Sequence, residues 1–448
     1  MGFLKVLRLR HLAILWLSQV LSAIGDRFYA IAVIWIAVKI AGSAAGIVVA
    51  AEAGSMLLFG LPGGIYADRW NRRTTMITVD LLRAAAVASL PILAQAGTLR
   101  LWRLAVVAIV VGGLGALFDP ALQASLPALT SDTQTLQAAN GLMDVTRRLA
   151  RVLGPSLAGL LITFLPLFHF FTVDAISFAI SAAALFSLGK RFAWKAARTQ
   201  GSVSSASCRD RGVGSGGCGG LVPVLVGMLE EIAGALRLVR SHSPLLWALV
   251  TNGLISVVWG IAFIIGAALL ADRVLGGNVG AYGLIVGAYG VGNVMGNLVI
   301  GSLTIRRRVA LIFTGRLVLG AGFLILAVAP TLLVALLGSA FAAIGGPMND
   351  IMTLTMIQTD LPADQVGKVY SLRTMLESLG LSLGLLLAVP LFAYLSIPLV
   401  IVSCALVMIA MGAVGLLRFG FSEPVITLAQ HGQSNLLVEH ASIEKPNL

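Results

Sequence analysis

The segment Gly64-Ile65-Tyr66-Ala67-Asp68-Arg69-Trp70-Asn71-Arg72-Arg73 is short and basic and lies between two long apolar runs. A segment of this length leaves no room for a domain, so the two runs must be antiparallel neighbours. We therefore expect a turn at one face of a membrane. The other segments of the chain can be placed relative to this turn.

The composition indicates an integral membrane protein. Hydrophobic residues make up 58% of the 448 residues and charged residues 11%, whereas soluble domains carry about 25% charged residues. The net charge is +12. Because the basic residues gather at the ends of apolar runs, we assign them to membrane orientation and the lipid surface. The lipid bilayer is therefore an expected partner, and nucleic acid is not.

The apolar runs predict an all-α fold with about twelve transmembrane helices, since a spanning helix needs about 20 apolar residues. The runs cover residues 11–39, 44–66, 74–96, 101–127, 140–166, 168–189, 244–271, 281–304, 309–329, 331–352, 369–395 and 396–418. They divide the chain into an N-terminal six-helix bundle (1–189), a linker (190–243), a C-terminal six-helix bundle (244–418) and a polar tail (419–448).

The distribution of basic residues predicts the orientation. With the N-terminus inside, the cytoplasmic segments and inner helix ends hold 24 Lys and Arg residues, whereas the outer segments hold four. This bias places both termini in the cytoplasm. In the linker, residues 201–220 are rich in Gly and Ser and predicted to be disordered. Residues 221–242 have apolar positions at helical spacing, which fits either an amphipathic helix on the inner membrane face or a simple tether.

The two halves resemble each other weakly. Residues 154–161 (GPSLAGLL) are similar to residues 380–386 (GLSLGLL), and the basic turn 306–308 follows its helix as 69–73 follows an earlier one. Internal repeats joined by a central linker are typical of transporters, whose substrate site lies midway through the membrane between the repeats.

Several motifs resemble the major facilitator superfamily, and within it the branch of macrolide efflux proteins and the bacterial enterobactin exporter. The segment Gly64-x-x-x-Asp68-Arg69-x-Asn71-Arg72-Arg73 resembles the superfamily's loop 2–3 signature, with Asn71 where glycine is commonest. Asn tolerates left-handed backbone dihedrals, so the turn is expected to survive. The other similar segments are 22–27 (SAIGDR), 80–84 (DLLRA), 118–121 (FDPA), 137–140 (QAAN), Gly154-Pro155-x-x-x-Gly159 and 358–362 (QTDLP).

The resemblance covers residues 1–420 and implies two six-helix bundles. In the superfamily, the loop 2–3 aspartate caps the start of helix 11 and holds the halves together when the cavity opens outward. This implies a cytoplasmic gate formed by Gly64, Asp68, Arg69, Arg72 and Arg73; the alternative is that these arginines only set orientation. Better-studied drug–proton antiporters carry an arginine within helix 4, whereas here Arg103 lies at the outer end of that helix.

Ionisable residues within the apolar runs are functional candidates, because a charge at the bilayer centre costs several kcal/mol. Asp26 and Glu52 are candidates for carrying protons in a shared aqueous cavity. The alternative for Asp26 is a structural pair with Arg27. Glu377 is the third candidate, as the carboxylate at depth in the C-terminal half.

Other residues are expected to act in structure, gating or binding. Asp80 and Arg83 have the i, i+3 spacing of a structural pair. Asp119 before Pro120, together with Gly154 and Pro155, marks candidate packing or gating positions. Asn293 and Asn297 lie in a glycine-rich helix, and with Trp35 and Trp259 they are candidates for lining the cavity, although aromatic residues more often face lipid or the core.

We therefore expect a monomeric secondary transporter of the cell membrane that exports amphipathic small molecules such as drugs, macrolides or siderophores by alternating access, with protons as the coupling ion. The sequence contains no Walker-type phosphate loop, and we expect no cofactor and no metal. One alternative is a lipid or lysophospholipid flippase on the same fold. A membrane-embedded enzyme is a weaker alternative, because the five histidines are scattered along the sequence.

Overall fold

The computed structural model describes residues 6–67, 71–129, 133–161, 164–188, 234, 236–237, 239–240, 243–276, 279–302, 307–361 and 363–420. Regular structure in these residues is entirely helical. The predicted linker and polar tail therefore lie almost wholly outside the described residues, as do Asp68 and Arg69 of the predicted gate.

The helices of the N-terminal half are α2 (Arg10–Ala41), the short turn η1 (Gly42–Ala44), α3 (Ala45–Ala67), α4 (Arg72–Gln95), α5 (Leu101–Leu129), α6 (Thr133–Leu161) and α7 (Phe168–Ser187). Those of the C-terminal half are α10 (Ser243–Trp259), the π-helix η3 (Gly260–Ile265), α11 (Gly266–Arg273), α12 (Val279–Ser302), α13 (Arg308–Ala327), α14 (Leu332–Asp360), α15 (Ala363–Tyr394) and α16 (Ile397–Phe419).

Ten stretches of the described residues are long and apolar enough to cross a membrane. One stretch, Arg10–Met56, runs through α2 and η1 into α3, and α6 is not among the ten. The sequence of α6 carries Asp144, Arg147 and Arg148. The all-helical membrane fold is thus confirmed, whereas the number of crossings stays a prediction.

Several helices extend beyond the apolar runs. Helix α6 begins at Thr133, seven residues before the predicted start, α14 continues to Asp360 and α15 begins at Ala363. These extensions are polar turns, such as the sequence Gln358-Thr359-Asp360 at the end of α14. A helix satisfies its backbone hydrogen bonds internally, so it need not end where the apolar residues end.

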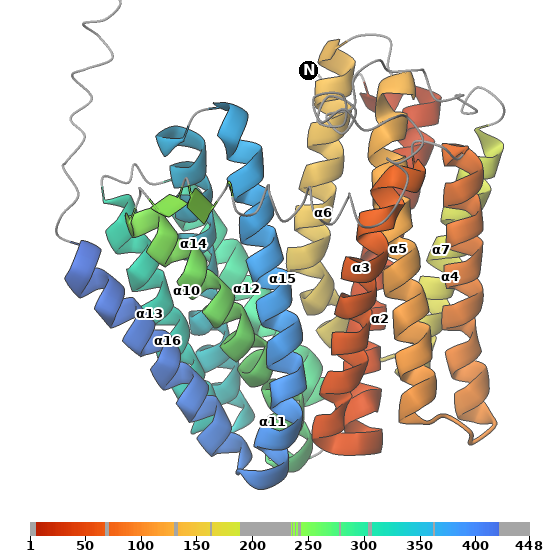
Figure 1. Cartoon of the computed structure of the whole chain (residues 1–448). Helices are drawn as coiled ribbons and strands as arrows, with labels where there is room; N and C mark the ends of the chain where they lie inside the picture. Colours follow the sequence, from red (N-terminus) through yellow and green to blue (C-terminus); the bar gives the residue numbers. More distant parts are fainter. Residues whose placement is uncertain are drawn as a thin grey trace, which may run out of the picture.

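The helices form two bundles that lie side by side (Figure 1). In the N-terminal bundle α2 packs on α6 and α7, and α5 packs on α3 and α4; in the C-terminal bundle α13 packs on α14 and α16, and α10 packs on α15. The bundles meet where α6 packs on α12 and α3 packs on α15.

The bundles are joined at the end that carries η1 and α11 (Figure 1). Lys39 of α2 forms an ion pair with Asp272 of α11. The ring of Trp35 stacks on that of Tyr282 of α12, with a centroid distance of 5.5 Å. The N-terminal end of α2 lies at the opposite end of the molecule (Figure 1). One end of the bundle interface is therefore held by a charge contact and an aromatic contact together.

Close packing of α12 depends on glycine. A Cβ atom on Gly292 would collide with the main chain of Ala340 in α14, whereas a Cβ atom on Gly301 would meet nothing within 4 Å. Small residues at such contacts allow the backbones of two helices to approach closely.

We expect Gly292→Ala to lower the stability of the protein by about 1–3 kcal/mol, the usual cost of overpacking a close contact. Gly301→Ala is the matched control on the same helix and should leave stability almost unchanged. The apparent melting temperatures of the purified variants in detergent measure the difference. Equal melting temperatures for the two variants would contradict the observed packing.

Candidate functional site

A cavity of about 420 Å³ lies between α2 and the C-terminal bundle. Helix α2 contributes Arg27, Ala30, Ile31 and Ile34 to one wall, and the remaining lining comes from α10, η3 and α12–α15. A cavity of this size and position falls in the usual range for small-molecule sites.

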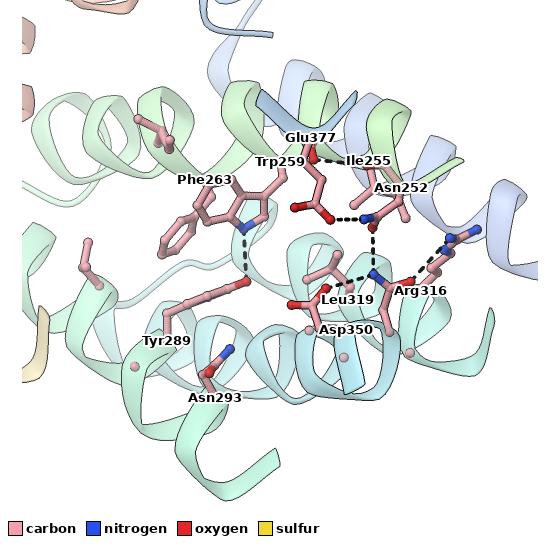
Figure 2. Close-up of a pocket in the computed structure, with 18 of the residues that line it drawn as sticks. Asn252, Ile255, Trp259, Phe263, Tyr289, Asn293, Arg316, Leu319, Asp350 and Glu377 are labelled. Carbon is pink, nitrogen blue, oxygen red and sulfur yellow. Dashed lines mark hydrogen bonds between the residues drawn. The ribbon is translucent and has the colours of Figure 1, made fainter. Parts of the chain in front are cut away.

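Aromatic side chains gather at one end of this cavity (Figure 2). The indole nitrogen of Trp259 donates a hydrogen bond to the hydroxyl of Tyr289, at 3.0 Å. The ring centroid of Phe263 lies 4.2 Å from that of Tyr289 and 5.5 Å from that of Trp259. All three residues line the cavity.

The π-helix η3 begins directly after Trp259 and contains Phe263. A π-turn widens the helix, which changes the direction of the side chains that follow it, and such turns occur frequently at functional sites. The irregularity in this helix therefore coincides with the aromatic end of the cavity.

Amide and carboxylate side chains form a hydrogen-bond network at the other end (Figure 2). The amide of Asn252 in α10 donates to Oε1 of Glu377 in α15. The amide of Asn349 in α14 donates to Oδ1 of Asn252 at 2.7 Å. The network thus connects three helices, α10, α14 and α15, across the cavity wall.

Arg373 links two carboxylates of this network. Its Nε donates to Oε1 of Glu377 at 2.6 Å, and its Nη2 donates to Oδ1 of Asp350 at 2.8 Å. The side chain of Arg373 is only 10% exposed, whereas that of Asp350 is 61% exposed and that of Glu377 33%. Both carboxylates line the cavity. The cation is thus covered, and negative charge faces the open space.

Arg316 of α13 closes the polar end of the cavity. Its Nη2 donates to the carbonyl of Ala248 at 2.9 Å, its Nη1 donates to the hydroxyl of Thr251, and Nη2 also contacts Oδ1 of Asn349 at 3.4 Å. The side chain is buried. Among the described residues it has hydrogen-bond acceptors but no carboxylate ion pair, so Arg316 anchors the network from behind.

A second cavity, of about 250 Å³, lies within the N-terminal bundle. Asp26, Arg83 and the exposed Asp119 line it. Arg27 lines both this cavity and the larger one. Gly154 of α6 packs against the aliphatic part of Arg27. The side chain of Arg27 therefore lies between the acidic interior of one bundle and the aromatic cavity beside the other.

The carboxylates predicted in the N-terminal half do not all share one cavity. Asp26 lines the smaller cavity, whereas Glu52 lines neither of the two and packs against Gly112 of α5. Arg27 acts electrostatically on Asp26, and the structural pair of these two residues stays a prediction. Asp26 and Glu52 thus do not line a common wall of these two cavities, and their shared role stays a prediction.

Asp80 and Arg83 likewise do not form the pair that their spacing predicts. Asp80 is buried and accepts a hydrogen bond from Ser181 of α7. Arg83 donates from Nε to the carbonyl of Val111 at 3.2 Å and lies 4.8 Å from the ring centroid of Phe178. Partners on neighbouring helices replace the local ion pair.

The basic turn forms structural contacts with the ends of two helices. The side chain of Asn71 caps α4 by accepting from the Thr74 amide, and its φ of −68° does not require a left-handed backbone. Arg73 donates to the carbonyls of Leu185 and Phe186 at the end of α7, at 3.1 Å and 2.7 Å. These contacts complement the negative end of the α7 dipole.

The remaining predicted residues are placed as follows. Trp259, Asn293 and Glu377 line the larger cavity. Trp35 lies instead in the contact between the bundles, and the exposed Asn297 donates to Asn293 of its own helix. Two carboxylates were not selected from the sequence: Asp350, which joins Glu377 at the cavity, and Asp174, which is buried in α7. Asp174 follows residues 170–173 (FFTV) in the predicted apolar run 168–189, and this isolated charge is a usable signal.

Two family models match this chain. The model described as "Transmembrane secretion effector" matches residues 2–206, and the model described as "Major Facilitator Superfamily" matches residues 249–438. Similar proteins include the multidrug efflux pump Tap of Mycolicibacterium fortuitum, 27% identical over 418 residues that cover 90% of this chain and 94% of that protein. Macrolide efflux protein A of Streptococcus pyogenes is 28% identical over 171 residues, which cover 38% of this chain and 42% of that protein.

Solved structures share the fold at low sequence identity. A POT family transporter in complex with 5-aminolevulinic acid has a TM-score of 0.66 at 13% identity, covering 92% of this chain and 96% of that one. A bacterial homologue of the human lysosomal transporter Spinster has a TM-score of 0.60 at 15% identity, covering 94% and 95%.

We expect Asn252→Leu to destabilise the C-terminal bundle, because it removes the shorter of the two acceptors of the Asn349 amide and one of the two donors to Glu377. A buried polar group left unpaired costs about 1–3 kcal/mol. The control is Asn297→Leu on the exposed face of α12. Apparent melting temperatures should fall for the first variant only, and an unchanged value for Asn252→Leu would show that the network contributes little.

Proposed function

Because the chain belongs to the major facilitator superfamily, as its sequence motifs predict, we propose that it exports amphipathic small molecules across the cell membrane by alternating access, coupled to proton influx. The observation that carries this proposal is the larger cavity, which combines an aromatic end with two cavity-facing carboxylates and shares Arg27 with a second cavity in the other bundle, lined by Asp26 and Asp119. The named relatives are multidrug and macrolide efflux proteins.

The lining of the larger cavity favours substrates with an aromatic or apolar body and a basic group. Trp259, Phe263 and Tyr289 present ring faces and edges, which bind apolar groups and attract cations. Asp350 and Glu377 supply negative charge at the other end. Their only described cationic partner, Arg373, already contacts both carboxylates, so a bound cation would compete with Arg373 for them.

The acidic interior of the N-terminal bundle supports proton coupling. Asp26 lies one residue from Arg27, whose side chain lines both cavities. When Asp26 gains a proton, Arg27 loses a nearby negative charge, and the electrostatic potential in the substrate cavity becomes more positive. A basic substrate is then bound less tightly, which is the linkage that antiport requires.

The contact between Lys39 and Asp272 fits the proposed orientation. The excess of basic residues predicts that η1 and α11 lie at the outer face. The bundles are joined at that end, which on the proposed orientation supports a state closed toward the outside. Alternating access then requires this contact to open while the opposite end closes.

Ethidium efflux from a pump-deficient host tests the proposed proton-coupled transport. Wild-type protein should export ethidium at a rate that rises with an imposed inward proton gradient. Asp26→Asn and Glu52→Gln should each reduce this dependence, because an amide cannot exchange a proton. Asp360→Asn, at the exposed end of α14, is the control. Unchanged gradient-driven export in both carboxylate variants would remove them as carriers, whereas gradient-independent lipid scrambling by the wild type would favour a flippase.

Ethidium binding to the purified protein tests the proposed substrate site. Trp259→Ala and Asp350→Asn should each raise Kd about three- to tenfold, since one aromatic or cation contact contributes about 0.5–1.5 kcal/mol. Trp102→Ala, an exposed tryptophan in α5 that does not line the cavity, is the matched control. Equal affinities for all four proteins would place the binding site elsewhere.

A further inference from the structure

Asp174 lies at the contact of α7 with α2 and α4 and is fully buried. The absence of a side chain at Gly25 allows this contact. A Cβ atom on Gly25 would lie 2.6 Å from Oδ1 of Asp174 and 2.6 Å from the hydroxyl of Ser177. Asp26 is the next residue along α2, and it acts electrostatically on Asp174.

The hydrogen bonds of Asp174 do not suit an ionised carboxylate. Oδ1 has one donor, the hydroxyl of Ser177 at 3.4 Å, and that hydroxyl also contacts the Asp174 carbonyl at 2.8 Å. Oδ2 is buried and has no hydrogen-bond partner among the described residues. A buried carboxylate with an unpaired oxygen is unfavourable in a low-dielectric interior. A proton on Oδ2 removes this charge.

The charged groups around Asp174 lead to the same conclusion. Asp26 of α2, Glu52 of α3 and Arg83 of α4 act on it electrostatically, and Tyr29 of α2 is a further titratable neighbour. Asp80 of α4 is buried in the same bundle. Two described guanidinium groups, those of Arg83 and Arg27, act on these carboxyl groups. Two cations cannot compensate all four carboxyl groups when these are ionised.

We propose that Asp174 is a second proton-binding residue of the coupling site, which holds a proton in this conformation and passes it to Asp26. In this step the O–H bond at Asp174 Oδ2 breaks and an O–H bond forms on the ionised Asp26 carboxylate. The charge of the pair is unchanged. Asp26 lines a cavity and can exchange the proton with water, whereas Asp174 stores it. This inference rests on the proposed proton coupling and adds a residue to it.

Infrared difference spectroscopy of the full-length protein in lipid vesicles tests the proposal without a transport substrate. A pH jump should produce a band from a protonated carboxylic acid that changes with pH in the wild type. We expect this band to be lost in Asp174→Asn and retained in Asp360→Asn. Ser177→Ala keeps the carboxyl and removes its donor, so it should shift the band in frequency, and this variant provides the test if Asp174→Asn fails to fold.

Two results would overturn the proposal. One is a spectrum that neither Asp174→Asn nor Ser177→Ala alters. The other is an Asp174 band that is present but does not respond to pH, which would make the proton a fixed structural one. Failure of the proposed function has a different signature: wild-type ethidium efflux would then be independent of the proton gradient, whatever the infrared spectra show.

Discussion

A charged side chain inside a membrane protein must find its partners within the protein, because the bilayer core supplies neither water nor counterions. The two bundles meet this constraint differently. In the C-terminal bundle, Arg373 contacts both Asp350 and Glu377, and Asn252 supplies a further donor to Glu377. Opposite charges there are matched and hydrogen-bonded. Such a network favours one arrangement of α10, α14 and α15, because partial loss leaves a charge uncompensated.

The N-terminal bundle has an excess of acids instead, of which Asp80 and Asp174 are buried and Asp26 lines a cavity. Asp26, Asp80 and Asp174 lie on three helices that pack together, and Asp80 and Asp174 each have one oxygen without a hydrogen-bond partner among the described residues. Arg83 is directed to a backbone carbonyl and an aromatic ring. A group of acids with few cations is stable only when some of the acids hold protons. On the proposed mechanism, this uneven division of charge assigns proton exchange to the N-terminal bundle and ligand binding mainly to the C-terminal one.

Apolar run length was sufficient to predict the helical membrane fold, and isolated polar or aromatic residues in those runs indicated Trp259, Asn293 and Glu377, which line the cavity. Sequence spacing could not give the rotation of each helix against its neighbours. Asn297 lies one turn from Asn293 and yet is exposed. Asp80 and Arg83 have the spacing of a pair, but Ser181 and the Val111 carbonyl on adjacent helices take their hydrogen bonds. Asp174 satisfied the rule that selected Asp26, so its omission was an error of selection and not a limit of the sequence.

The position of Arg27 gives the two specialised bundles a short path of communication. Its side chain lines the acidic cavity and the aromatic cavity, and Gly154 lets α6 pack against its aliphatic part. On the proposed mechanism, the N-terminal bundle tilts against the C-terminal one, and α2 moves past η3 and α12 as it does so. The neighbours of Arg27 in its own bundle then stay nearly constant, while its distance from Asp350 and Glu377 changes. Charge interactions weaken with distance and with hydration. The tilt that opens the cavity therefore also changes the electrostatic effect that protonation of Asp26 has on a bound cation. On this mechanism, coupling does not need a series of conformational changes through the protein core. It needs only Arg27, whose side chain lines both cavities, and a relative movement of the two bundles.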